Sequence, residues 1–218
     1  MGLIVFEGID GSGKSTQFRR LCAYMDSLGR SYTRVVFPQY DQPSSALLRM
    51  YLDGTFGQDP DAVNAYAAST FYAVDRYASY KTVWGEAYRR GDLVLADRYT
   101  TSNAVHQGSK LTGAARREFF SWLDEFEHVQ MELPRPDIVL YMDTPFETAI
   151  GNIRIRGNAM DIHEAGDDYL SRCAVAAREA AEFYGWRPVP CVAKNGTMRP
   201  EAEIHQAILD ILKVAELI

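Results

Sequence analysis

The residues best suited to chemistry lie near the start of the chain. Residues 8–15 read Gly-Ile-Asp-Gly-Ser-Gly-Lys-Ser and match the pattern G-x-x-x-x-G-K-[ST] at every position. Glycines let such a loop curl until its backbone N–H groups point at phosphate oxygens, and Lys14 adds a cation for the β- and γ-phosphates. Ser15 offers a hydroxyl to the Mg²⁺ ion that accompanies a nucleotide. The motif predicts an ATP site formed by Gly8, Ile9, Asp10, Gly11, Ser12, Gly13, Lys14, Ser15 and Thr16.

Asp10 is an unusual residue within this loop. A carboxylate in an anion-binding loop repels the ligand unless it serves another group, such as an acceptor hydroxyl or a metal ion. A solvated loop carboxylate is the alternative interpretation.

A second charged pair, Asp97-Arg98, directly follows the apolar run at residues 93–96. Arg98 can hold an acceptor phosphate through two parallel hydrogen bonds. Asp97 can bind magnesium through water or orient Arg98. A purely structural ion pair at the end of a strand is the alternative.

Two further segments carry side chains that could contact a base or a phosphate. Phe71 and Arg76 lie on one helical pattern, where the ring can stack on a base and the guanidinium can donate to a carbonyl, although core packing is the commoner role of such a ring. Residues 152–169 carry Arg154 and Arg156, with Gly157 and Gly166 as possible hinges. This segment is a candidate lid that brings positive charge to a transferring phosphoryl group, and a solvated helix end is the alternative.

These residues must be positioned by a sheet, and the hydrophobic pattern predicts one. Short apolar runs predict strands at residues 3–6, 32–37, 93–96, 138–142 and 189–193. Longer patterns with helical spacing separate them, at residues 14–28, 44–52, 60–89, 112–130, 145–154, 168–184 and 200–217. This alternation predicts an α/β fold, a three-layer αβα arrangement of the P-loop type with a five-stranded parallel sheet. Ligands bind at the carboxyl ends of such strands.

Composition limits the classes of function. A length of 218 residues with 47% hydrophobic content suits one domain, which we expect to span residues 1–218. The net charge of −6 argues against a general nucleic-acid-binding protein. The cysteines, Cys22, Cys173 and Cys191, are far apart, which fits a reducing compartment. No apolar run approaches the roughly 18 residues of a membrane span, so we expect a cytoplasmic protein with neither membrane nor nucleic-acid partners.

Taken together, these motifs resemble the thymidylate kinase family over nearly the whole chain. Residues 6–17, which include the phosphate loop, are similar to the opening of that family, and so is the Phe37-Pro38 step. Asp97-Arg98-Tyr99, followed by Ser102, Asn103, Gln107 and Gly108, is similar to the family's Asp-Arg segment. Phe71 and Arg76 lie where its base-binding helix is expected.

The resemblance implies a homodimeric enzyme that transfers the γ-phosphoryl group of Mg·ATP to dTMP. It implies that Phe71 stacks on thymine, that Arg76 bonds O4 and that Asp10 lies near the 3′-hydroxyl. The implied acceptor-binding residues are Asp10, Phe37, Arg49, Phe71, Arg76, Arg98, Asn103, Gln107 and Tyr169. The implied catalytic residues are Lys14, Asp10, Arg98, Arg154 and Arg156, with Ser15 and Asp97 near the metal. Asp161 and Glu164 also match the lid.

The chain departs from the family pattern at three points. Position 11 is Gly where some members carry a phosphate-loop arginine, so the resemblance gives that arginine's task to the lid. Val36-Phe37-Pro38 replaces the Arg-Glu-Pro of many bacterial members. His106 stands where a tyrosine is expected, which affects discrimination against the ribose 2′-hydroxyl.

Two other functions remain open on the residues alone. A deoxynucleoside kinase shares the phosphate loop but needs a carboxylate base for a neutral 5′-hydroxyl, and Glu7 is a candidate for it. A nucleotide-dependent switch shares the loop as well, but such switches read guanine through Asn-Lys-x-Asp, which the sequence lacks.

Overall fold

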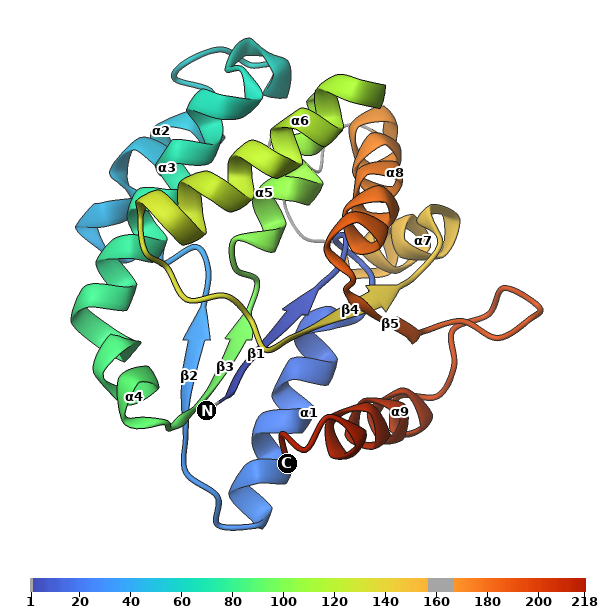
Figure 1. Cartoon of the computed structure of the whole chain (residues 1–218). Coiled ribbons are helices and arrows are strands. Elements are labelled where there is room, and N and C mark those ends of the chain that lie inside the picture. Colours follow the sequence, from blue (N-terminus) through green and yellow to red (C-terminus); the bar gives the residue numbers. More distant parts are fainter. Residues whose placement is uncertain (1, 157–166) are drawn as a thin grey trace.

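The computed structural model describes residues 2–156 and 167–218, and a five-stranded sheet forms its centre (Figure 1). The strands are β1 (Gly2–Glu7), β2 (Tyr32–Val36), β3 (Leu93–Asp97), β4 (Ile138–Asp143) and β5 (Arg187–Pro190). They pair in the order β2-β3-β1-β4-β5, and every pair is parallel. The predicted five-stranded parallel sheet is therefore confirmed.

The helices alternate with the strands as the pattern predicted. They are α1 (Lys14–Ser27), α2 (Ala46–Leu52), α3 (Ala65–Ser79), α4 (Gly85–Arg90), α5 (Thr101–His106), α6 (Gly113–Asp124), α7 (Phe146–Arg156), α8 (Asp167–Tyr184) and α9 (Glu201–Val214). Two π-helical turns extend this set: η3 (Tyr80–Trp84) joins α3 to α4, and η5 (Glu125–Gln130) follows α6. Short 3-10 turns lie at Pro43–Ser45 (η1), Pro60–Ala62 (η2) and Gly108–Lys110 (η4).

Three boundaries differ from the prediction. The helix expected over residues 60–89 is interrupted, because Asn64 caps α3 by accepting a hydrogen bond from the backbone N–H of Ala67 at 2.9 Å. Helix α5 was missed, since its six residues are too few to show a period. Strand β5 was placed too late, at residues 189–193.

The position of β5 follows from its edge location and its prolines. Pro188 and Pro190 have no N–H to donate, which an edge strand tolerates on its outer side. The strand pairs residue by residue with β4 and ends at Pro190, opposite Asp143. Beyond it, Val192 bridges antiparallel to Met198 instead.

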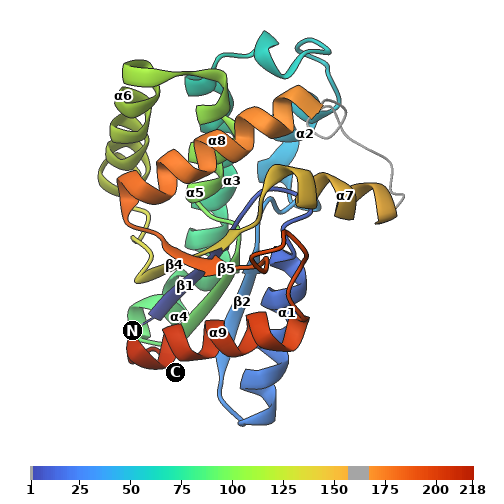
Figure 2. The same ribbon diagram turned by 90° about the vertical axis from the view of Figure 1, so that its right-hand side faces the viewer.

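Both faces of the sheet are covered by helices (Figures 1 and 2). Side chains alternate along β1, so Ile4 and Phe6 pack in one cluster with residues of α1 and α9. Leu3 and Val5 pack in the other cluster, which includes residues of α3, α5, α6 and α8. Of the helices that the structure describes, none combines the length and apolarity needed to cross a membrane. The result is a three-layer αβα arrangement with a core on each side of the sheet.

The packing of α9 against the sheet gives a test of the fold. Ile208 is fully buried, whereas Val214 on the same helix is 85% exposed. We expect Ile208→Ala to lower the free energy of unfolding by about 2–5 kcal/mol, because it leaves a cavity in the core. Val214→Ala is expected to change it by less than about 0.5 kcal/mol. Urea denaturation followed by circular dichroism measures both, and equal losses would contradict this packing.

Candidate active site

The phosphate loop joins β1 to α1 and packs directly against α7. Gly11 has a φ of +81°, and a Cβ at this position would lie 2.1 Å from the backbone carbonyl oxygen of Ala149. The side chain of Asn152 donates to the carbonyl oxygen of Gly11 at 2.8 Å. In this arrangement position 11 has no room for a side chain, which accounts for the glycine there.

Lys14 lies at the first position of α1 and points toward the end of β3. Its Nζ donates to Oδ1 of Asp97 at 3.0 Å, and both side chains are almost fully buried. Parallel pairing of β1 with β3 sets Phe6 opposite Asp97, so the carboxylate lies beside the start of the loop. Asp97 therefore holds the ammonium of Lys14 at the end of β3, beside the phosphate loop.

The oxygen atoms near this lysine suit a magnesium ion. Ser15 is half-buried beside Lys14 on α1, and its hydroxyl and the Asp97 carboxylate are the oxygen donors that Mg²⁺ prefers. Within residues 2–156 and 167–218, no three His, Cys, Asp or Glu side chains gather into a metal-binding group. The donor set thus fits an ion that keeps water and phosphate oxygens among its ligands.

A cavity of about 300 Å³ opens beside the phosphate loop, on the side of α7. Gln17 lies in its wall, where its Nε2 donates to the backbone carbonyl of Glu201 and its buried Oε1 has no partner among the described residues. The cavity is lined by Ser12, Gly13, Thr16, Gln17, Met142, Asn152, Ile155, Met198, Arg199, Glu201 and Ile204.

A second cavity, of about 180 Å³, lies on the other side of Asp10 and is called here the acceptor cavity. Its walls come from the phosphate loop, the loop after β2, and helices α2, α3 and α5. It is lined by Asp10, Phe37, Pro38, Tyr40, Leu52, Tyr72, Arg76, Arg98, Tyr99, Ser102, Asn103, His106 and Gln107. Six of the nine predicted acceptor-binding residues thus lie together, although they are far apart in the sequence.

Arg98 is the lining residue of the acceptor cavity that lies nearest to two carboxylates, those of Asp10 and Glu7. Its Nη2 donates to Oδ1 of Asp10, its Nη1 lies 2.9 Å from Nε2 of His106, and Oε1 of Glu7 lies 3.7 Å away. Burial disfavours the charge, but the carboxylates of Asp10 and Glu7 outweigh it and raise the pKa of Arg98. The backbone of Arg98 has a φ of +67°, a left-handed conformation that costs about 1 kcal/mol or more. The guanidinium is thus a permanent cation held at the mouth of the phosphate loop.

Glu7 ties the phosphate loop to α5. The side chain is fully buried, and its Oε1 accepts a hydrogen bond from the N–H of Gly8 at 2.9 Å. Its Oε2 accepts from the hydroxyls of Thr101 and Ser102, each at 2.6 Å. With both oxygens engaged by three protein donors, Glu7 is a structural link rather than an exposed base.

Two polar side chains on the inner wall of the acceptor cavity, Arg76 and Asn103, share one buried partner. Arg76 and Glu127 form a two-point ion pair, with Nε–Oε2 at 2.7 Å and Nη2–Oε1 at 2.5 Å. Nδ2 of Asn103 donates to the same Oε1 at 2.9 Å. Glu127 was missed from the sequence, because a glutamate within a helical pattern gives no local sign that it will be buried.

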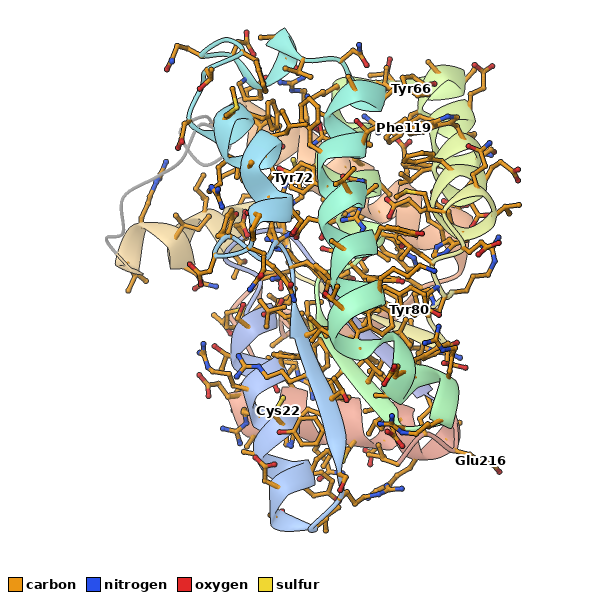
Figure 3. The ribbon with its side chains drawn as sticks, turned by 90° about the vertical axis from the view of Figure 1, so that its left-hand side faces the viewer. Cys22, Tyr66, Tyr72, Tyr80, Phe119 and Glu216 are labelled. Carbon is orange, nitrogen blue, oxygen red and sulfur yellow. The ribbon has the colours of Figure 1, made fainter. Side chains whose placement is uncertain are left out.

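The ring predicted to meet the base, Phe71, does not line the acceptor cavity. Phe71 packs instead against Tyr51 and Phe56, with ring centroids 6.4 and 5.8 Å away. Its neighbour Tyr72 lines the cavity, near α2 (Figure 3). The reason is helical geometry: residues four apart share a face, so Tyr72 accompanies Arg76, while Phe71 is rotated away. The spacing to Arg76 could have identified Tyr72.

Arg49 also lies away from the acceptor cavity. Its Nη1 donates to the carbonyl oxygens of Tyr40 and Gln42 and to the hydroxyl of Ser45. These contacts close the loop that carries Tyr40, which does line the cavity. Arg49 thus supports a wall of the cavity, and its direct contact with the acceptor stays a prediction.

Tyr169, at the end of the candidate lid segment, lies beside a residue that lines the acceptor cavity. Tyr169 is buried on α8, with its hydroxyl 3.3 Å from Nδ1 of His106. Its ring is stacked on the imidazole of His106, with ring centroids 6.3 Å apart. It therefore contacts the lining residue His106 rather than the cavity itself. Arg154 is exposed on α7, while the side chain of Arg156 and residues 157–166, with Asp161 and Glu164, lie outside the described part of the chain.

Comparisons with known proteins agree with this geometry. Residues 6–204 match the family model described as thymidylate kinase. The chain is 32% identical to the thymidylate kinase of Mycobacterium tuberculosis over 192 residues, covering 85% of this chain and 88% of that one. It is 32% identical to that of Xanthomonas oryzae over 171 residues, covering 78% and 68%.

A solved structure shares the fold. Thymidylate kinase from Candida albicans superposes with a TM-score of 0.74 at 18% identity, covering 99% of this chain and 92% of that chain. At this identity the match supports the fold alone, whereas the family model and the two bacterial relatives cover most of the sequence. The chain belongs to the thymidylate kinase family.

Proposed function

We propose that the chain transfers the γ-phosphoryl group of Mg·ATP to dTMP, giving dTDP and ADP, in the biosynthesis of dTTP. As a member of the thymidylate kinase family it is a nucleoside monophosphate kinase with thymidylate as acceptor. The observation that carries the residue assignment is the position of Asp10. It belongs to the phosphate loop and also lines the acceptor cavity, where it pairs with Arg98.

On the donor side, the loop of residues 8–16 holds the polyphosphate. Its backbone N–H groups and the start of α1 favour negative charge, and Lys14 serves the β- and γ-phosphates. Ser15 and Asp97 hold the magnesium ion, which neutralises phosphate charge when it is bound. The cavity beside Gln17 takes the remainder of ATP.

On the acceptor side, Arg98 grips the phosphate of dTMP and directs an oxygen toward the donor. Tyr72 stacks on the thymine ring, and Phe37 also lines the cavity. Gln107 contributes an amide whose nitrogen and oxygen are both buried and have no partner among the described residues. A base that enters this cavity satisfies such groups.

Phosphoryl transfer in this site depends on alignment and charge rather than on a strong base. The acceptor phosphate oxygen is already an anion, so it needs no deprotonation. Arg98 offsets the repulsion between acceptor and donor, and Asp10 holds Arg98 in place near the sugar's 3′-hydroxyl. Arg154 and Arg156 supply charge from the lid, at about residues 152–169.

The engaged state of Glu7 bears on the rival activity. A deoxynucleoside kinase has to activate a neutral 5′-hydroxyl, which requires an accessible carboxylate. Glu7 is fully buried and accepts three hydrogen bonds. Phosphorylation of thymidine therefore lacks support from this side chain.

The assembly we propose is a cytoplasmic homodimer of single-domain subunits spanning residues 1–218. Tyr66, Val74 and Tyr77 form an exposed stripe along α3, with exposed fractions of 39, 49 and 38%. Tyr66 packs edge-on against Phe119 and Trp122 of α6, so the stripe continues into an aromatic cluster (Figure 3). An apolar face of this kind suits a second copy of the chain.

An acceptor screen tests the proposed reaction. With ATP and Mg²⁺ present, we expect coupled ADP release to require dTMP. UMP and thymidine are expected to give less than about one-hundredth of its rate, since thymidine lacks the phosphate that Arg98 holds and UMP lacks the thymine methyl and carries an additional 2′-hydroxyl. dUMP, which lacks only the thymine methyl, is expected to react more weakly than dTMP. Efficient turnover of thymidine would instead identify a nucleoside kinase.

Exchange of the two neighbouring aromatic residues tests which ring meets the base. Tyr72→Ala is expected to raise the KM for dTMP by about 5- to 150-fold, because a stacking contact contributes about 1–3 kcal/mol. Phe71→Ala is the matched control, and its KM for dTMP is expected to stay within about threefold of wild type, with any loss confined to stability. Steady-state kinetics at saturating ATP decides between them, and the reverse pattern would restore Phe71 as the stacking residue.

A pair of charge substitutions tests the dimer. Val74→Glu on α3 is expected to shift the mass toward that of one chain, 24.5 kDa, because it buries a charge in the proposed interface. Val175→Glu on α8, at a site with a similar exposed fraction of 48%, is expected to leave a dimer. Light scattering after size-exclusion chromatography measures both masses. A wild-type protein of one-chain mass would refute the dimer.

A further inference from the structure

The fully buried Glu127 lies behind the acceptor cavity, on the π-helical turn η5. It does not line the cavity, but two of the residues that do, Arg76 and Asn103, are hydrogen-bonded to it. Arg76 comes from α3 and Asn103 from α5, so one carboxylate joins two walls of the cavity. These contacts limit which atoms of Arg76 and Asn103 can bond a ligand in the cavity.

For Arg76, the contacts leave the two N–H groups of Nη1 and the second N–H of Nη2. Nε and Nη2 both donate to Glu127, at 2.7 and 2.5 Å. These two atoms occupy one edge of the planar guanidinium, so Nη1 lies at the opposite corner. The side chain is only 2% exposed, which prevents it from turning. Arg76 therefore presents an N–H donor to the cavity.

For Asn103, the contacts determine which way the amide faces. Nδ2 donates one hydrogen to Oε1 of Glu127 at 2.9 Å and the other to the backbone carbonyl of Ser69 at 3.1 Å. A carboxylate and a carbonyl accept hydrogen bonds but cannot donate them. The reversed amide would set its oxygen against two acceptors. Asn103 therefore presents Oδ1, an acceptor, to the cavity.

The resulting pair of groups is complementary to one kind of pyrimidine. Thymine has an acceptor at O4 and a donor at N3–H, whereas cytosine has a donor at N4 and an acceptor at N3. A donor on Arg76 beside an acceptor on Asn103 matches thymine and opposes cytosine at both positions. We propose that Glu127 is a positioning residue that sets this polarity and so selects dTMP against dCMP, an inference that rests on the proposed function.

Glu127→Gln tests this role, because an amide can donate as well as accept, so the substitution removes one of the two acceptors that hold the Asn103 amide in its orientation. We expect the ratio of kcat/KM for dTMP to that for dCMP to fall by about tenfold or more, which corresponds to the loss of about one hydrogen bond's discrimination. The KM for dTMP is expected to rise, while kcat at saturating substrate stays within about threefold. The acceptor phosphate is held separately, by Arg98.

Two further variants separate positioning from general stability. Glu125→Gln removes an exposed carboxylate from the same turn. For this variant the ratio of kcat/KM for dTMP to that for dCMP is expected to stay within about twofold of wild type. Glu127→Asp keeps a group that only accepts, so it is expected to retain the preference for dTMP with a higher KM. It serves as the test if Glu127→Gln does not fold, and a preference for dCMP in it would overturn the proposal.

The outcomes distinguish this inference from the proposed function. A wild-type enzyme without activity on dTMP would refute the function itself. A wild-type enzyme that prefers dTMP, together with a folded Glu127→Gln variant of unchanged preference, would refute only the role of Glu127. Melting temperatures of all variants, measured by differential scanning fluorimetry, establish that each one is folded.

Discussion

Parallel pairing of β1 with β3 brings opposite charges together at the carboxyl ends of these two inner strands. The register sets Phe6 opposite Asp97, so Glu7 and Asp97 end neighbouring strands, with Arg98 and the phosphate loop directly beyond them. Lys14 then meets Asp97, and Arg98 meets Asp10. Each cation is held by a carboxylate in a partly desolvated place, where charges act more strongly than in water. A shift of one residue in this register would separate all of them.

Buried carboxylates give the site its rigidity. Glu7 and Glu127 are both fully buried and engaged by protein donors, and each joins elements that meet only in the folded chain. Burying a charge is costly unless its hydrogen bonds are complete, and these two have several each. Neither needs to touch a substrate to matter. They determine how the arginines and the asparagine face the acceptor cavity, which is the preorganisation that transfer between two anions requires.

Local patterns accounted for much of the site. The phosphate loop, the Asp97-Arg98 pair and the strands of the sheet could be predicted from the sequence, since each depends on residues close together in the chain. The helical period also indicates that Tyr72, four residues before Arg76, lies on the same face of the helix as Arg76. The prediction named Phe71 instead, which packs against Phe56. Arg49 was assigned to the acceptor only through the family resemblance. Its actual partners are carbonyls of its own loop, which no spacing rule indicates.

The fold class, the phosphate loop and the thymidylate kinase resemblance can be predicted from the order of residues, because hydrophobic periods and glycine-lysine spacing are properties of neighbouring residues. The partners of the buried polar groups become known only from the folded chain. Arg76 and Glu127 are 51 positions apart, and Glu7 and Thr101 are 94 apart. Such contacts depend on how α3, α5 and η5 pack around the sheet. The sequence does not distinguish a glutamate that is exposed to water from one that is buried against an arginine.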